Sequence, residues 1–131
     1  MAKSIEKQLN DLLDDFYQLV RDEYEGAAKD VAEECARRLR AVKWKTNAHR
    51  NYSRHWTATK QRWGSYAVHN KGRTACLTHL LENGHVAINA KGIVGRASPH
   101  KHIAPVYEWA QGEILREIKQ RIEREAGGIY G

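Results

Sequence analysis

The chain has 131 residues, which is enough for one domain with its own core but too few for two. Its net charge is +6, and its hydrophobic residues, 41% of the total, form no stretch near the roughly 20 residues of a membrane-spanning helix. We therefore expect a single domain (1–131) without a membrane partner. Because the first residues lead into acidic helical sequence, not an apolar signal core, we also expect a cytosol-like compartment.

Charge is distributed unevenly along the chain. Residues 1–34 hold four basic and ten acidic residues, a net charge of −6, whereas residues 35–107 hold fourteen basic residues and one acid, a net charge of +13. No acid occurs in the 47 residues from Cys35 to Leu81. Such a field attracts polyanions or an acidic partner surface. The alternative is that these charges only form a solvated face.

The first part of the chain, residues 1–43, is helical by its period. Ser4 precedes Ile5, the first residue of the apolar stripe, and is a candidate N-cap. Gly26 interrupts the pattern, so the sequence allows either one long helix or two helices joined there. The apolar stripe recurs at spacings of three and four. Its members are Ile5, Leu9, Leu12, Leu13, Phe16 and Leu19, then Ala27, Val31, Cys35, Leu39 and Val42.

Residues 44–104 change to a shorter period. Alternation over 52–60 predicts a strand, and Gly64-Ser65 predicts a turn into a returning strand over 66–69. Residues 74–82 read as a short helix that Gly84 ends. Residues 85–98 are expected to form either a second hairpin or a mobile loop.

The last part, residues 105–126, is a helix with an apolar residue every three or four positions. Pro105 suits its first turn, and Gly127-Gly128 is expected to end it. The predicted fold class is therefore α+β: an N-terminal helix or helix pair, a small antiparallel sheet with a short helix, and a long C-terminal helix.

A search for chemistry finds no catalytic, cofactor or metal site. His79 and His85 flank Glu82, but they lack the ligand spacings of a zinc site, and we expect this group to form hydrogen bonds that fix the short helix and its exit. Glu82 is the single acid of residues 35–107, so the carboxylate ligands of a two-metal nuclease are missing there. Cys35 and Cys76 are interpreted as small buried hydrophobes.

Aromatic residues alternate with cations in the basic part. Trp44, Trp63 and their neighbours could stack on unpaired bases, whereas strand aromatics more often belong to the core. We assign Trp56 and Tyr66 to the core. The cations are candidate contacts to a polyanion or an acidic partner: Arg50, Arg54, Lys60, Arg62, Lys71 and Arg73.

Three short segments resemble the head–tail joining family of tailed phages with long, non-contractile tails. Members of this family form part of the neck or complete the tail, and they are often described as minor tail components. The resemblance covers about residues 50–125, and its central nine positions, 77–85, align without a gap. The segment at 99–103 is longer than in the family, and a Pro and a Gly that often precede the first strand are absent. The motif residues are Leu77, Thr78, His79, Leu80, Leu81, Glu82, Gly84, His85, Pro99, His100, Ile103 and Pro105.

The resemblance implies a structural virion protein without an enzymatic activity. It would act in the neck or tail as a ring of identical subunits, after assembly in the host cytoplasm. Its partners would be connector or head-completion proteins and tail-tube or tail-terminator proteins, with non-specific contact to passing DNA. Rings follow from heterologous contacts that close. The basic residues 35–107 would suit the lumen of such a ring.

The alternative is a basic DNA-binding protein, such as a phage or bacterial regulator. A reader of the major groove needs a short basic recognition helix after a tight turn. The predicted short helix over 74–82 is apolar and carries an acid, which argues against this class.

Overall fold

The computed structural model describes residues 4–90 and 92–130 of the chain. Helix α1 runs from Ile5 to Arg40, and the Ser4 hydroxyl caps it by accepting the backbone N–H of Lys7 at 3.1 Å. The helix continues through Gly26 without a break. Residues 4–43 therefore contain one long helix, and not a pair.

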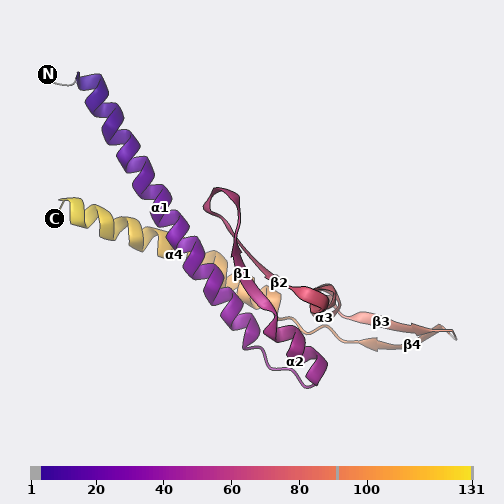
Figure 1. Cartoon of the computed structure of the whole chain (residues 1–131). Coiled ribbons are helices and arrows are strands. Elements are labelled where there is room, and N and C mark those ends of the chain that lie inside the picture. Colours follow the sequence, from indigo (N-terminus) through magenta and orange to yellow (C-terminus); the bar gives the residue numbers. More distant parts are fainter. Residues whose placement is uncertain (1–3, 91, 131) are drawn as a thin grey trace.

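Helix α4 (Ile103–Tyr130) crosses α1 (Figure 1), and its Arg121 side chain lies against Gly26. The Arg121 guanidinium of α4 lies against α1 and pairs with Glu23 at 3.6 Å and with Asp30. A Cβ at position 26 would lie 2.6 Å from the Arg121 Nη1 atom, so the glycine makes room for this contact. The expected stop at Gly127-Gly128 is wrong, because α4 continues to Tyr130.

The core lies where α1, α2 (Asn47–Arg54) and a β-hairpin meet. Predicting a strand from residue 52 was wrong for its first four positions, because α2 extends to Arg54 and His55 is its C-cap. Thr46 caps this helix by accepting the N–H of His49 at 3.1 Å. Tyr52 and Trp56 are one helical turn apart, so a spacing that fits an alternating strand also fits a helix. The buried cluster consists of Leu39, Trp44, Tyr52, Trp56 and Leu81.

The first hairpin pairs β1 (Trp56–Lys60) with β2 (Tyr66–Asn70) in antiparallel register, with Trp56 opposite Asn70. A 3-10 turn, η1 (Arg62–Gly64), joins the strands as the predicted turn requires. Trp56 is buried as expected, whereas Tyr66 is only half-buried. This hairpin packs against the C-terminal half of α1, where the Arg40 guanidinium donates to the Trp56 carbonyl at 2.8 Å.

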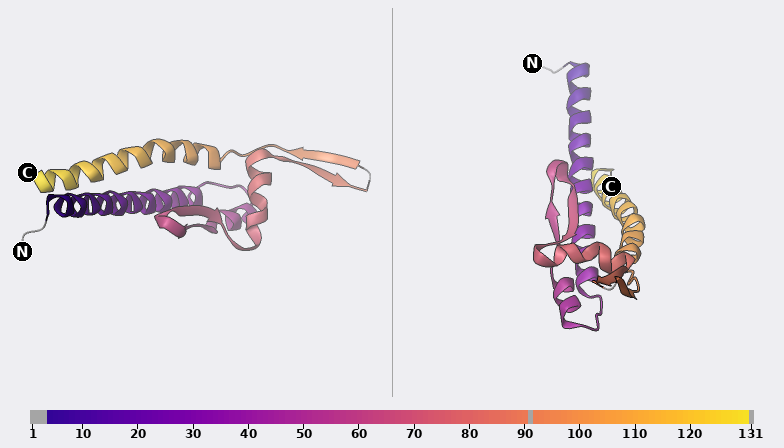
Figure 2. Two further views of the ribbon diagram at one scale, coloured as in Figure 1. Left: turned by 90° about the horizontal axis from the view of Figure 1, so that it is seen from above. Right: turned by 90° about the vertical axis from the view of Figure 1, so that its right-hand side faces the viewer.

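The predicted short helix forms as two pieces, the 3-10 helix η2 (Gly72–Leu77) and α3 (Thr78–Asn83). Of the two alternatives for residues 85–98, the structure has the hairpin: β3 (His85–Asn89) pairs with β4 (Gly92–Ala97), with a register shift at Ala87/Ile88. This second hairpin projects from the body on the side opposite the start of α1 (Figures 1 and 2). The chain is thus mostly helical, with the predicted order of elements.

Two further expectations concern the cysteines and the membrane. Cys35 is buried in α1, but Cys76 is exposed, so only the first is a core residue. Burial raises the pKa of the Cys35 thiol. No helix within residues 4–90 and 92–130 has the length and hydrophobicity needed to span a bilayer.

Candidate functional site

The motif residues meet at one place, the junction between α3, the root of the second hairpin and the start of α4. The central element is the Glu82 carboxylate at the end of α3. It accepts the backbone N–H groups of His102 at 2.9 Å and Ile103 at 3.0 Å, and that of Ala104 at 3.4 Å. These N–H groups have no partner within α4, and a carboxylate there also complements the helix dipole. Glu82 therefore caps a helix that begins 21 residues later in the chain.

His102 is the most buried polar residue of this junction. Its Nδ1 lies 2.8 Å from the His100 carbonyl, and its Nε2 lies 2.7 Å from the Tyr52 hydroxyl. A carbonyl can only accept, so Nδ1 carries the proton and Nε2 accepts from the tyrosine. Burial raises the pKa of Tyr52, which keeps that phenol protonated. Both imidazole nitrogens are thus used in hydrogen bonds, Nδ1 with the backbone of the hairpin root and Nε2 with the Tyr52 side chain.

Aromatic rings enclose this pair. Trp44 contacts Tyr52 edge-on at 5.9 Å between ring centroids and His102 at 5.2 Å, and it lies 4.1 Å from the ring of His100. The sequence did not lead us to assign Trp44 to the core. No local pattern connects Tyr52 with His102, which are 50 residues apart.

Two more contacts close the root of the β3–β4 hairpin. The N–H of His100 donates to the Leu81 carbonyl at 2.8 Å, and the Lys101 ammonium donates to the Asn83 amide oxygen at 3.1 Å. Between them Gly84 turns the chain at φ 79° and ψ 172°, a conformation that only glycine adopts readily. We call the contacts of Glu82, His102, Tyr52, Leu81 and His100 the hairpin clamp.

The remaining motif residues take supporting positions. Leu81 is buried in the core, and Leu77 and Ile103 pack against it. Leu80 is exposed, because α3 presents the face with Leu81 to the core. Thr78 is half-buried, while His79, Pro99 and Pro105 are exposed, and the side chain of His85 lies outside the described residues. Pro105 occupies the first turn of α4, as predicted.

The six candidate contact cations do not form one cluster. Arg54, Lys71 and Arg73 lie where β1 begins and β2 ends, whereas Lys60 and Arg62 lie at the opposite end of that hairpin, about 17 Å away along the strands. Lys60 is not a free cation, because its ammonium lies 2.5 Å from the Glu25 carboxylate of α1. Arg50 donates to the Trp44 carbonyl at 3.1 Å. At least two of the six cations, Arg50 and Lys60, therefore form contacts within the monomer.

Trp63 is the most exposed of the described Trp, Tyr and Phe residues in the basic part. It lies beside Arg62 at the hairpin turn with 87% of its surface accessible. Its φ of 64° is a left-handed conformation that is uncommon for a residue other than glycine. An exposed indole beside a guanidinium is suited to stacking against a base or a partner's ring.

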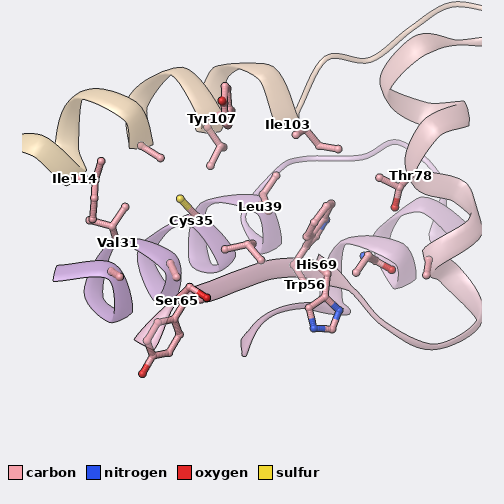
Figure 3. Close-up of a pocket in the computed structure, with 18 of the residues that line it drawn as sticks. Val31, Cys35, Leu39, Trp56, Ser65, His69, Thr78, Ile103, Tyr107 and Ile114 are labelled. Carbon is pink, nitrogen blue, oxygen red and sulfur yellow. The ribbon is translucent and has the colours of Figure 1, made fainter. Parts of the chain in front are cut away.

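An apolar groove of about 740 Å³ lies between α1, α4 and the first hairpin. Figure 3 shows Val31, Cys35 and Leu39 of α1 facing Ile103, Tyr107 and Ile114 of α4 across it, with Trp56 at its floor. The sequence gave no sign of this groove, because its lining comes from four separate segments. Among the described residues, no three or more His, Cys, Asp or Glu side chains are placed to hold a metal ion.

Comparison of the chain with models of protein families, with curated proteins and with solved structures finds no match. The resemblance to the head–tail joining family therefore rests on the sequence motif alone, and the geometry of the hairpin clamp is an independent observation about the same residues.

Proposed function

We propose that the chain is a structural protein of the neck of a tailed phage, where a ring of identical subunits joins the head to the tail. The observation that carries the proposal is the use of the motif residues. Glu82 is the motif residue with the side chain most typical of an active site, yet its carboxylate accepts backbone N–H groups at the start of α4. His102, beside the motif residue Ile103, bonds to the His100 carbonyl and to the Tyr52 hydroxyl. A motif that builds a junction is what an assembly protein needs.

The shape of the subunit supports the same class of function. The start of α1 and the β3–β4 hairpin project in opposite directions from a small body (Figures 1 and 2). Projecting elements of this kind reach neighbours in an assembly. In this proposal the partners are further copies of the chain, a connector or head-completion protein on one side and a tail protein on the other, with DNA passing through the ring.

Head–tail joining in vitro tests the proposal. Purified chain is added to extracts that lack it but contain heads and tails, and joined particles are counted by electron microscopy. We expect joining with the parent chain and a loss of at least tenfold with the double variant Arg54→Glu, Arg62→Glu. Lys60 is left unchanged, because its reversal would place a second carboxylate beside Glu25.

The matched control reverses Lys119 and Arg124, two exposed cations of α4 outside the basic part. It changes the net charge by the same amount and is expected to join normally. Failure of the parent chain to support joining would overturn the proposed function. Normal joining by the folded Arg54/Arg62 variant would show that these two charges are a solvated face only.

A DNA-binding protein is the second candidate, and helix α2 is the observation that favours it. This short helix was not predicted, it carries Arg50 and Arg54, and its Asn51 and Arg54 are exposed. Its other face is committed to the core through Tyr52 and Ser53. For a neck protein we expect DNA binding that is independent of sequence and weakens steeply with salt, measured by fluorescence anisotropy. Salt-resistant binding to one sequence would favour a regulator instead.

A further inference from the structure

The apolar groove has the lining expected of a surface that binds a helix. It includes Val68, Val106 and Ile114, which remain partly exposed to solvent, and among the described residues no Asp, Glu, Lys or Arg. Grooves of this kind bind one face of an amphipathic helix, through side chains at positions i, i+3, i+4 and i+7. The volume of about 740 Å³ is large enough for several such side chains.

The start of α1 carries that pattern of side chains. Leu9, Leu12, Leu13 and Phe16 have the spacing i, i+3, i+4 and i+7, and their accessible fractions are 53%, 65%, 56% and 58%. We call these four residues the α1 tip. Four large apolar side chains on one face of a solvated helix form a patch that soluble proteins rarely leave without a partner.

The tip cannot reach the groove of its own chain. Both belong to the same unbroken helix, since α1 lines the groove from Tyr24 to Leu39. Leu12 and Val31 are separated by about 28 Å along the helix axis. The groove must therefore take its occupant from another molecule.

Charge favours the groove of a second copy over a tip-to-tip contact. Residues 4–22 hold five acids and two bases, with Asp11, Asp14 and Asp15 between the apolar positions. Two tips packed together would bring these carboxylates near one another. The lining of the groove has no carboxylate among the described residues and includes His69 and His79, so a tip docked there does not meet a second set of acids in the lining.

From these observations we propose that the α1 tip of one subunit docks in the apolar groove of the next. Such a contact is heterologous: each subunit offers one tip and one groove, so the contact repeats until it closes into a ring or extends as a filament. The docking contact adds detail to the proposed function. It rests on that function in one respect: in a phage neck the contact must close into a ring.

The test measures the mass of the full chain in solution by sedimentation or light scattering over a range of concentrations. The parent chain is expected to form an assembly larger than a dimer. Leu12→Glu should weaken association at least about 30-fold, as expected for loss of a central apolar contact. Leu115→Glu is the matched control: this leucine is 71% exposed on α4, away from tip and groove, and its substitution should leave association unchanged.

A mixing experiment tests the direction of the contact. Tyr107→Glu alters an exposed residue of the groove and places a carboxylate where the acidic tip would dock. Each variant alone should be monomeric at 15.0 kDa, while their mixture should give a 1:1 pair, because one intact tip and one intact groove remain. Circular dichroism of both variants confirms that they are folded.

Three results would overturn the docking proposal: a parent chain that stays monomeric, assembly by Leu12→Glu equal to that of Leu115→Glu, or a mixture that forms no pair. None of these decides the neck function, which the joining assay tests separately. The parent chain could also assemble through its tip but fail to join heads to tails. That result would contradict the neck function and still support the docking contact.

Discussion

The two halves of α1 have the same apolar spacing but opposite surroundings. In the C-terminal half, Val31, Cys35 and Leu39 are buried against α4, α2 and the first hairpin, whereas in the N-terminal half Leu9, Leu12 and Phe16 face solvent. The change from exposed to buried apolar residues occurs near Gly26, where Arg121 of α4 contacts α1. Periodicity predicts that a helix has an apolar face, and it does not say whether the same chain covers that face.

The largest difference between the two halves is expected from a pair of leucines. Leu39→Ala should lower the free energy of unfolding by about 2–5 kcal/mol, because the side chain is 3% exposed and its loss leaves a cavity. Leu12→Ala, at 65% exposure, should change it by less than about 0.5 kcal/mol in the monomer. Urea unfolding at low protein concentration measures both. Equal losses would mean that the N-terminal half is packed within the monomer.

A second pair extends the comparison to carboxylates at helix starts. Glu82→Ala removes the acceptor from the first N–H groups of α4 and should lower the free energy of unfolding by about 2 kcal/mol. Glu6→Ala, in the exposed first turn of α1, should lower it by no more than about 0.5 kcal/mol. Thermal or urea unfolding provides the values. Glu82→Gln, which keeps an acceptor oxygen, should fall between parent and alanine; a loss equal to that of alanine would contradict the capping role.

The smallest effect concerns the pH dependence of the packed half. The hydrogen bond from Arg37 holds the pKa of Glu34 down to about 2, from an ordinary value of 4.5, with a further contribution from Arg38. A depressed carboxylate pKa adds stability that is present above pH 4.5 and is lost as the pH falls towards 2. Glu34→Gln should therefore be less stable than the parent by under about 1 kcal/mol at pH 7, with the difference vanishing near pH 2. A difference that persists at pH 2 would assign the effect to packing.

The order of the elements other than α2 was predictable, since each of them has a local signal. Ser4, the turn at 64–65, Gly84 and Pro105 mark boundaries that the structure also has. What could not be predicted depends on contacts between distant residues. The last three residues of α2, 52–54, were predicted as strand because a spacing of four suits both structures, and in the structure this segment is helical with Tyr52 buried in the core. Gly26 and Gly127-Gly128 have the form of helix stops, but packing against Arg121 and helix continuation override that local preference.

The sequence predicted which residues belong to the candidate site, but not how those residues interact. The motif identified Glu82, His100 and Ile103 as belonging together, and hydrogen bonding was the expected role of Glu82. The Glu82 carboxylate bonds to the N-terminus of α4. This contact depends on the second hairpin, which reverses the chain, and no local pattern predicts it. The apolar groove was missed for the same reason.

The hairpin clamp has a mechanical consequence. Leu81 and Glu82 are adjacent, and one holds the returning strand segment through His100 while the other holds the first turn of α4. We therefore expect a force applied to the β3–β4 hairpin to reach the first turn of α4 through these two neighbouring residues. A pull on the hairpin would then tilt α4, because Leu81 and Glu82 hold both segments.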